Sequence, residues 1–441
     1  MAQSPYYSPY VAGVPHYDVA VVGAGLAGLS TCVLLRNAGL SVVCVEGQTC
    51  PHSKVGESLD WSSPGLLQRL GVGADRLLAD EIATYKRKIV VCELGRPQWM
   101  ATPPPQIARN PLRFETVTLH VDREALDARL LERAQSLGTS FVWERMRVVD
   151  WSGERVTGCT TETGRRIEAR WYVDASGTAR ALSRAMHIPI TSYGRPKVCL
   201  WAYFDTPPLD DGTVFFVDNR EEYLSWIWDI PISPYRTSVG LVVPAETVRD
   251  RRRAGDTVET VLRNTLARHP RFSALLQRTP VLAVESTSFQ PYVTDRVCGA
   301  NWLMAGEAAS MPDPLTGNGV TSGIRHARHA AEAILAAGSR DQLTSGQRRA
   351  YSRHVFRLGH SFNAHIENAV YRHPVRWGLG LKTATYVYTF FAFFMNALHA
   401  RFDPRGRAAM AAFAVLFGVA RVWIAGWTLV ARAALWRRPT A

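Results

Sequence analysis

The sequence lacks the short cysteine and histidine patterns that usually bind metal ions or form redox-active disulfides. Its seven cysteines are odd in number, none belongs to a C-x-x-C pair, and most lie inside apolar runs. Such residues are typical of reduced, buried thiols in a cytosolic chain. Four histidines lie close together in sequence without a metal-ligand spacing to any acid or cysteine: His354, His360, His365 and His373. We therefore expect no metal site.

The N-terminal segment 1–16 lacks the basic region and the apolar core of a signal peptide. It is polar, rich in tyrosine and interrupted by proline. We expect a flexible N-terminal tail and a cytoplasmic protein.

The C-terminal region 346–441 lacks an apolar run of the ~18 residues that a membrane-spanning helix needs. Its uncharged runs Thr383–Leu398 and Ala408–Ala420 have 16 and 13 residues. A helix there would carry three arginines within about 40° of one another on a helical wheel: Arg407, Arg421 and Arg432. We expect a helical cap packed on the rest of the molecule. A helix lying on a membrane surface is the second interpretation, and a true span is the third.

Acidic residues are outnumbered by basic ones, 38 against 51, which gives a formal net charge of +13. Nucleic acid, an anionic membrane surface and an acidic protein are all compatible with such a charge. No RNA-binding or zinc-finger pattern accompanies it, so we expect no nucleic acid partner and interpret the charge as a solvated basic face. With 47% apolar residues over 441 positions, the chain has room for two or three packed units.

The segment 17–46 has the pattern of a buried strand, a glycine-rich turn, a helix and a second strand. Gly23 would allow the sharp turn, Gly25 would let the backbone approach a pyrophosphate, and Gly28 would let the helix pack closely on the strand. The free N–H groups at the helix start would then face an anion. Glu46 ends the second strand 18 residues after Gly28, where a carboxylate suits a ribose hydroxyl. We therefore predict a dinucleotide-binding site.

The strand-to-small-turn design recurs at Asp174–Gly177 and again at Gly306, which predicts a discontinuous nucleotide-binding domain. Its parts are residues 17–84, 120–187 and 290–345. The segments 85–119 and 188–289 alternate short apolar runs with turns, which predicts an inserted antiparallel sheet that forms the substrate-binding domain. The predicted fold class is mixed α/β (α+β), with a Rossmann-like domain, the inserted sheet and the C-terminal helical cap.

Four of these features together resemble the FAD-dependent monooxygenase superfamily, over residues 17 to about 337. They are the first glycine turn, an Asp-Arg-x-x-Leu-Asp helix, the Asp174–Gly177 turn and the segment from Gly306 to Gly319. The resemblance implies FAD as cofactor, reduced by a flavin reductase or by NAD(P)H, with O2 as co-substrate. Glu307 stands where the superfamily has an aspartate on the ribitol chain. Besides the first three glycines and Glu46, the resemblance assigns cofactor contacts to Arg123, Asp174, Gly177, Gly306, Glu307, Pro314, Gly317, Asn318 and Gly319.

A narrower resemblance, to the flavin-dependent tryptophan halogenases, rests on three further stretches. Ser225–Pro231 has the W-x-W-x-I-P form of that group, and Lys54–Leu59 is similar to its flavin-loop motif. Lys86, on the strand after that loop, matches the position of the active lysine.

The halogenase resemblance also implies roles for the residues of these stretches. Lys86 would polarise the reactive oxygen or a hypohalous acid, and Glu57 would take the ring proton or hold that lysine. Trp226 and Trp228 would wall the route from flavin to substrate, while Ser58 would contact FAD.

The glycine loop 313–319 departs from the halogenases, which usually carry Ser, Thr or Glu side chains there for halide and acid chemistry. Its sequence, D-P-L-T-G-N-G, is more similar to hydroxylating and reducing relatives. We therefore expect hydroxylation of an electron-rich aromatic ring, an indole, tryptophan or phenol, through a flavin C4a-hydroperoxide. Halogenation of an aromatic substrate is the alternative.

The substrate class stays open between a free small molecule and a residue within a protein. Relatives of the halogenase group include a peptidyl-tryptophan hydroxylase of tryptophylquinone maturation, and a basic surface would help to bind an acidic protein substrate. A geranylgeranyl-reductase-like flavoprotein is a further alternative. Peripheral membrane contact through the apolar C-terminal helices would favour it, whereas the W-x-W-x-I-P segment argues against it.

Overall fold

The computed structural model describes residues 16–48, 55–60, 63–93, 100–102, 118–208, 210–218, 223–281 and 283–372, with Val422 and Gly426. The uncharged C-terminal runs and most of the predicted tail lie outside these residues, as does Lys54. Among the described helices, none combines the length and apolar character needed to cross a membrane.

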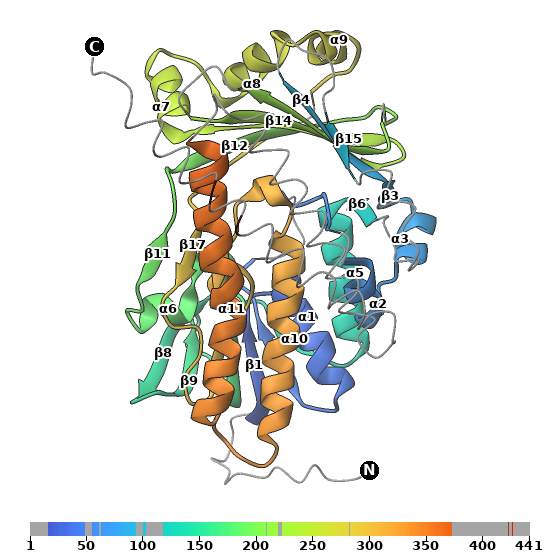
Figure 1. Cartoon of the computed structure of the whole chain (residues 1–441). Coiled ribbons are helices and arrows are strands. Elements are labelled where there is room, and N and C mark those ends of the chain that lie inside the picture. Colours follow the sequence, from blue (N-terminus) through green and yellow to red (C-terminus); the bar gives the residue numbers. More distant parts are fainter. Residues whose placement is uncertain are drawn as a thin grey trace, which may run out of the picture.

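The first layer is a sheet of seven described strands whose order is β7-β2-β1-β10-β9-β8, with β18 also beside β10. Figure 1 labels β1, β8 and β9 of this sheet. The strands β7, β2, β1, β10 and β18 run parallel, while β8, β9 and β10 form an antiparallel meander. Val19–Val22 of β1 are buried, which suits a central parallel strand covered on both faces. The bounds are β1 (His16–Val22), β2 (Val42–Val45), β7 (Ser140–Val142), β8 (Met146–Ser152), β9 (Arg155–Thr161), β10 (Arg166–Asp174) and β18 (Trp302–Met304).

Long helices pack beside this sheet. The helix that follows β1, α1 (Leu26–Asn37), contacts both α5 (Arg123–Ser136) and α10 (Gly319–Ala337). The last long helix, α11 (Ser345–Ile366), runs alongside α10 and continues into a π-helical turn, η4 (Glu367–Tyr371).

The second layer is a sheet of seven described strands in the order β16-β12-β15-β14-β13-β4-β5. The pairing is antiparallel except between β13 and β4, which run parallel, so the predicted sheet is antiparallel only in part. β4 precedes β13 by a long stretch of chain, which leaves room for the crossover that a parallel pair needs. The bounds are β4 (Lys88–Glu93), β5 (Met100–Thr102), β12 (Lys197–Phe204), β13 (Gly212–Asp218), β14 (Ser225–Ser233), β15 (Arg236–Pro244) and β16 (Val284–Phe289).

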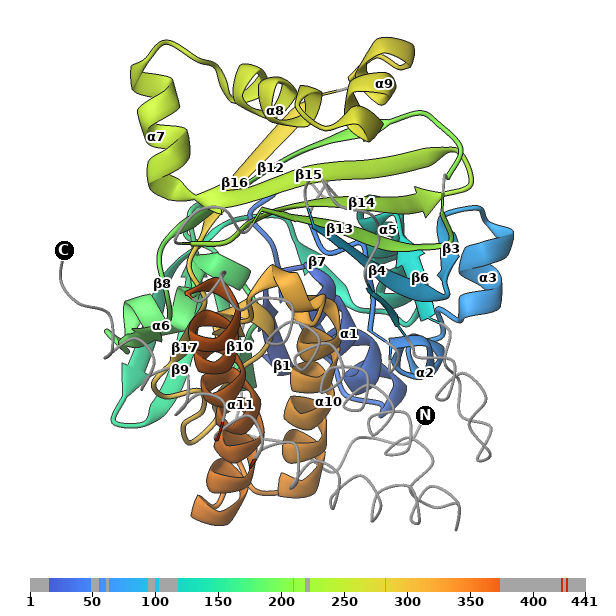
Figure 2. The ribbon, with the colours of Figure 1, turned by 45° about the horizontal axis from the view of Figure 1, so that its top comes forward.

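The two faces of the second sheet are buried against different partners. Three helices cover the outer face (Figure 2): α7 (Ala245–Arg253), α8 (Val258–Ala267) and α9 (Pro270–Arg278). The inner face packs against the end of α11 and the loop before α10. β14 shows the alternation plainly, because Trp226 and Trp228 belong to the inner cluster and Ile227 to the outer one.

Short elements connect the layers. A two-stranded sheet pairs β3 (Ala83–Lys86) with β6 (Thr118–Val121), and a three-stranded sheet has the order β11-β17-β19. The remaining bounds are α2 (Ser63–Arg69), α3 (Ala74–Ala79), α6 (Ala181–Ala185), β11 (Ile190–Ser192), β17 (Tyr292–Thr294), β19 (Ser310–Met311), η1 (Gly177–Ala179), η2 (Gly306–Ala308) and η3 (Pro314–Thr316). The six described cysteines are free thiols.

The close contact of α1 with the turn before it yields a test. A Cβ atom on Gly28 would lie 1.8 Å from the carbonyl oxygen of Gly23, so we expect Gly28→Ala to lower the free energy of unfolding by about 1–3 kcal/mol or more. Gly346→Ala in α11, where an added Cβ meets only ordinary contacts, should leave stability unchanged or raise it by up to about 1 kcal/mol. Denaturant unfolding of both variants measures the difference, and equal stabilities would contradict the assigned contact.

Candidate active site

Four parallel strands of the first sheet end in one row. Val22 of β1 pairs with Val45 of β2 and with Asp174 of β10, and Asp174 pairs in turn with Met304 of β18. The residues that follow each strand therefore meet at the same edge of the sheet, where dinucleotides bind in open α/β folds. The structure thus brings together the glycine turn, Glu46, the Asp174–Gly177 turn and the turn at Gly306.

The glycine turn is in close contact with its neighbours. Gly23 has φ of 102°, and a Cβ there would lie 2.5 Å from the carbonyl oxygen of Ala175. Gly25 precedes α1 in an extended conformation, and the first turn of α1 carries no acidic residue. Because the first N–H groups of a helix have no partner within it, they present a binding site for a pyrophosphate.

Two carboxylates lie at this edge as the sequence predicts. Glu46 accepts hydrogen bonds from the N–H groups of Ala24 (2.7 Å) and Gln48 (3.0 Å), so it touches the glycine turn directly. Glu307 is exposed between buried neighbours, and its Oε2 lies 3.8 Å from the point where a Cβ on Gly177 would be. This edge of the sheet therefore has an exposed acid beside Gly177, which lacks a side chain.

Asp174 differs from its predicted role as a cofactor contact. Its buried carboxylate accepts hydrogen bonds from the N–H (3.0 Å) and hydroxyl (2.6 Å) of Ser176 and from the N–H of Leu182 (2.8 Å). Burial raises the pKa of Asp174, although these hydrogen bonds act in the opposite direction. The Asp174 carboxylate therefore stabilises the turn that follows its own strand at the sheet edge.

Arg123, at the start of α5, supports the loop that carries the halogenase-like motif. One guanidinium N–H donates to the carbonyl of Val55 (3.1 Å), and the other terminal nitrogen lies 3.3 Å from Asp127. A Cβ on Gly56 would lie 2.6 Å from the Arg123 guanidinium, so only glycine fits there. The buried Nε of Arg123 has no hydrogen-bond partner among the described residues, which leaves it a donor for a bound group.

The loop 313–319 leads into α10 through irregular backbone. Pro314 begins the short turn η3, Gly317 is left-handed with φ of 61°, and Asn318 precedes the helix. Gly319 is exposed, and an added Cβ there would meet nothing within 4 Å. The start of α10 is therefore accessible at Gly319, and its first N–H groups have no acceptor within the helix, so a contact with a cofactor stays a prediction for this end.

Lys86 ends β3 in a buried position, with 2% of its surface exposed. Its ammonium donates to the carbonyl oxygen of Leu59 at 2.9 Å. Burial lowers the pKa of Lys86 to about 7, and the charge of Asp60 partly offsets that effect. Such a tuned lysine in a dry setting is typical of catalytic sites.

Glu57 does not hold Lys86 as one of its predicted roles requires. It is buried, and its carboxylate accepts from the N–H of Gly56 (2.9 Å) and from the hydroxyl of Ser238 (3.0 Å). Burial raises the pKa of Glu57. The carboxylate whose charge acts on Lys86 is that of Asp60.

Ser58 also differs from its predicted role at FAD. Its hydroxyl shares a hydrogen bond with that of Thr213 (2.8 Å), which in turn shares one with Nε2 of His120 (2.8 Å). Burial, and secondarily the charge of Lys86, lowers the pKa of His120 well below its usual value, so the ring is neutral. Ser58 is thus part of a buried polar chain beside Lys86.

The sequence analysis missed four residues that build this site: Asp60, His120, Thr213 and Ser238. Asp60 directly follows the Lys54–Leu59 motif, so its position was the available signal. The other three come from strands that pair only in the folded chain.

The three halogenase-like stretches meet in the folded chain. Thr84 of β3 donates a hydrogen bond to the carbonyl of Pro231 at 2.6 Å, so the strand that carries Lys86 is attached to the W-x-W-x-I-P strand. Leu59 and Glu57 bond through their backbones to β6, the partner of β3. The three stretches, far apart in sequence, form one buried unit.

Trp226 and Trp228 lie side by side on the inner face of β14, with ring centroids 5.7 Å apart. The indole N–H of Trp228 donates to Ser238 (3.0 Å), and that of Trp226 donates to the hydroxyl of Tyr371 (3.0 Å). Both donors are therefore used within the protein. A wall of the substrate route remains a prediction for these rings.

Comparison with known proteins identifies the family. A family model described as "FAD binding domain" matches residues 16–354. The chain belongs to that FAD-binding family. The predictions of FAD as cofactor and of a flavin-dependent oxidoreductase are confirmed at this level.

The relatives of this flavoprotein are mainly halogenases. A tryptophan 2-halogenase of Chondromyces crocatus is 27% identical over 75% of this chain, which spans 62% of that relative's length. A 1H-pyrrole-2-carbonyl-[peptidyl-carrier protein] brominase of Pseudoalteromonas luteoviolacea is 25% identical over 72% of this chain and 77% of its own. A menaquinone reductase of Mycobacterium tuberculosis is 26% identical over 72% and 76%.

The solved structure of the flavin-dependent brominase Bmp2 superposes with a TM-score of 0.72. It covers 92% of this chain and 98% of its own at 22% identity, so it establishes the fold. The predicted mixed α/β fold class is confirmed.

The two acids at the sheet edge yield a matched test. Because Glu307 is exposed, Glu307→Gln should weaken FAD binding by about tenfold while the stability of the apoprotein stays unchanged. Asp174→Asn should lower the stability of the apoprotein by about 1–3 kcal/mol, because it leaves a buried hydrogen-bond donor unpaired. Fluorescence titration with FAD and thermal unfolding measure the two effects. Loss of apoprotein stability in Glu307→Gln would contradict its assignment to the cofactor.

Proposed function

We propose that this flavoprotein is a flavin-dependent halogenase that acts on an electron-rich aromatic substrate. The observation that carries the proposal is the buried Lys86, hydrogen-bonded to Leu59 and attached through Thr84 to Pro231. Three stretches that resemble the halogenases thus form a single unit around one lysine. The predominance of halogenases among the relatives supports halogenation above the hydroxylation expected from the glycine loop.

The cofactor supplies two electrons and the activation of O2 when it is bound in its reduced form. Halogenation then balances as follows: the aryl C–H bond breaks, a carbon–halogen bond forms, and O2 is reduced to two molecules of water. Two of the four electrons come from the reduced flavin and two from the halide and the ring. The protein must provide a dry path and a cation for the oxidised halogen.

Lys86 can provide the cation for the oxidised halogen. The ammonium donates to the carbonyl of Leu59, and the charge of Asp60 favours its charged form, so Lys86 is suited to hydrogen-bond the oxygen of a hypohalous acid. Hydrogen bonding to the oxygen makes the halogen more electrophilic, which is what attack by an aromatic ring requires. The buried surroundings strengthen this interaction because few water molecules screen it.

Glu57 has a different role from Lys86. It is tied to Trp228 through Ser238, so its buried carboxylate lies in the wall of the site near the motif tryptophans. Its raised pKa makes it a better proton acceptor than an exposed glutamate. We assign Glu57 the role of accepting the proton that leaves the aromatic ring, and not that of holding Lys86.

The substrate is an indole, a phenol or a pyrrole, free or attached to a protein. The relatives' names include a tryptophan 2-halogenase and a brominase of a pyrrole bound to a carrier protein, and a net charge of +13 would help to bind an acidic protein substrate. A flavin reductase would supply reduced FAD.

Hydroxylation is the second candidate, because the loop 313–319 is D-P-L-T-G-N-G, without a glutamate, and its one acid, Asp313, is paired with Lys197. Reduction of an isoprenoid quinone is the third, and the similarity to menaquinone reductase favours it.

Product mass distinguishes these reactions. Purified protein, FAD, a flavin reductase with NADH, O2 and an aromatic substrate panel should give halogenated product when chloride or bromide is present. Added oxygen mass would support hydroxylation, and two added hydrogens without O2 use would support the reductase. Lys86→Ala should lower product formation by about 100-fold or more with FAD still bound, because its proton donor is lost. Lys88→Ala is the matched control, since Lys88 is a surface residue paired with Asp210 and Asp211.

The lowered pKa of Lys86 predicts a pH profile. Its ammonium is present below about pH 7 and is lost as pH rises through that value, so product formation should fall on the alkaline side of about pH 7. An arginine stays charged, so the residual activity of Lys86→Arg should show no such decline. Initial product rates between pH 6 and 9 (about the stable range of most proteins) measure this, with peroxide release as a control for flavin oxidation. A rate that rises with pH in the wild-type protein would show that the neutral amine is the active form.

A further inference from the structure

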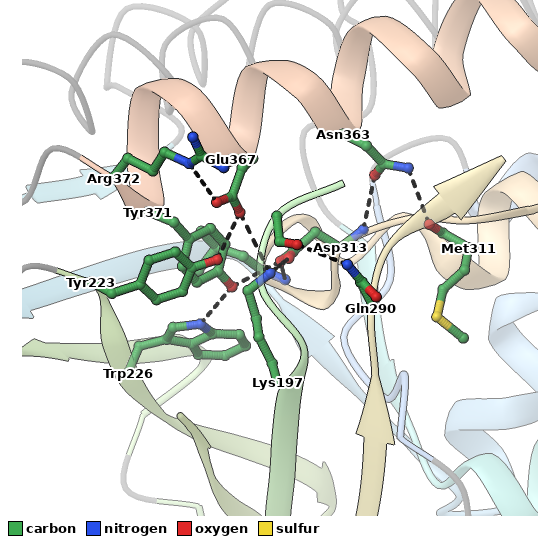
Figure 3. A network of polar contacts seen from close by, with 12 residues as sticks. Lys197, Tyr223, Trp226, Gln290, Met311, Asp313, Asn363, Glu367, Tyr371 and Arg372 are labelled. Carbon is green, nitrogen blue, oxygen red and sulfur yellow. Dashed lines mark hydrogen bonds and ion pairs between the residues drawn. The ribbon is translucent and has the colours of Figure 1, made fainter. Parts of the chain in front are cut away.

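A buried charged network joins the second sheet, the loop before α10 and the end of α11 (Figure 3). Lys197 of β12 lies 3.2 Å from Oδ2 of Asp313 and 3.7 Å from Oε2 of Glu367. The exposed fractions of these side chains are 1%, 2% and 6%, so the charges are almost fully withdrawn from water. Arg372 adds a second cation, 3.0 Å from the other oxygen of Glu367.

Tyr371 is the bridge between this network and the W-x-W-x-I-P strand. Its hydroxyl accepts a hydrogen bond from the indole N–H of Trp226 (3.0 Å) and donates one to Oδ1 of Asp313 (3.0 Å). The ammonium of Lys197 lies 4.2 Å from the centroid of the Tyr371 ring. The motif tryptophan is therefore joined through one phenol to the acid that begins the loop 313–319.

The loop itself is held largely by side chains from other elements. Asn363 of α11 accepts from the N–H of Asp313 (3.3 Å) and donates to the carbonyl of Met311 (3.1 Å). Oδ1 of Asp313 also accepts from the N–H of Leu315 (3.0 Å), within the turn η3. Since irregular backbone has no ladder of its own, these contacts decide where the loop and the start of α10 lie.

The π-helical turn η4 fits this task. Glu367 and Tyr371 are its first and last residues, and Figure 3 shows both side chains directed toward Lys197. π-helical turns are uncommon and occur frequently at functional sites. A buried ion network of this kind is poor evidence of stability, because apolar residues could replace it, but it fixes one geometry.

We propose that Tyr371 and Asp313 are positioning residues for the loop 313–319. Trp226 contributes to the position of this loop through its hydrogen bond to Tyr371. The proposal rests on the proposed function for the placement of that loop beside the flavin. It gives Trp226 a role that differs from its neighbour Trp228, whose indole is tied instead to Ser238 and Glu57.

A matched pair of phenol variants tests the proposal. Tyr371→Phe removes the hydroxyl that links Trp226 to Asp313. Tyr223→Phe removes a hydroxyl from the ring stacked on Tyr371, 5.1 Å away, and that hydroxyl donates to Glu367 at 2.7 Å. Tyr371→Phe loses two buried hydrogen bonds and Tyr223→Phe loses one, and only the first variant cuts the contact with the loop.

The readouts are the absorbance spectrum and midpoint potential of bound FAD, and the hydrogen peroxide released per reduced FAD. We expect Tyr371→Phe to shift the spectrum and potential and to raise peroxide release by about tenfold, since small displacements at a reacting centre have large effects. Tyr223→Phe should lower the unfolding temperature, since it also loses a buried hydrogen bond, but should keep the flavin readouts of the wild type. Equal flavin readouts in the two variants would overturn the proposal.

Trp226→Phe gives a second, independent route to the same result. If Trp226 acts through Tyr371, its variant should reproduce the flavin changes of Tyr371→Phe, and the double variant should add nothing further. Additive effects would overturn the assignment of Trp226. Should Tyr371→Phe fail to fold, a wild-type flavin spectrum and peroxide yield in Trp226→Phe would overturn it as well.

These readouts do not depend on the product. If the mass of the product shows hydroxylation or reduction, halogenation is wrong, while the flavin spectrum, the potential and the peroxide yield still decide the role of Tyr371.

Discussion

The parallel register of β1, β2, β10 and β18 is the constraint on which the rest of the molecule depends. It places Val22, Val45, Asp174 and Met304 in one row, so that each strand ends at the same edge. The glycine contacts at Gly23 and Gly28 then bring α1 against that edge without space for a side chain. A slip of one residue in any of these strand pairs would move one turn away from the others at this edge. It would also direct the buried side chains of that strand to the opposite face of the sheet.

The second sheet is organised by a different requirement, since each of its faces is buried against another layer. Trp226 and Trp228 can lie on the inner face because the alternate residues of β14 satisfy the outer one, where Asp229 pairs with Arg271. The polar atoms of the inner face are then used in pairs, through Ser238 to Glu57 and through Tyr371 to Asp313. Both indole N–H groups of the motif thus have acceptors within the protein.

Local patterns in the sequence were sufficient to predict the strands and turns at the edge of the first sheet, because strand, turn and glycine spacing are encoded within a few residues. They also singled out Lys86, Glu57 and the two tryptophans, whose catalytic roles stay predictions. They were insufficient for the partners of these residues. Asp60 rather than Glu57 acts on Lys86, and Asp174 is consumed by its own turn, because side-chain direction depends on strand alternation and on pairing. Thr213, Ser238 and Tyr371 come from distant strands and from a helix end, so no spacing in the chain could indicate them.

Pro231 has a consequence that its apolar side chain does not suggest. Its nitrogen carries no hydrogen, and the pairing of β14 with β15 shifts between Pro231 and Ser233. The ladder is therefore irregular at the motif, where the carbonyl of Pro231 accepts a hydrogen bond from Thr84 of β3, a strand of another sheet. This contact attaches the strand that bears Lys86 to the second sheet at its proline.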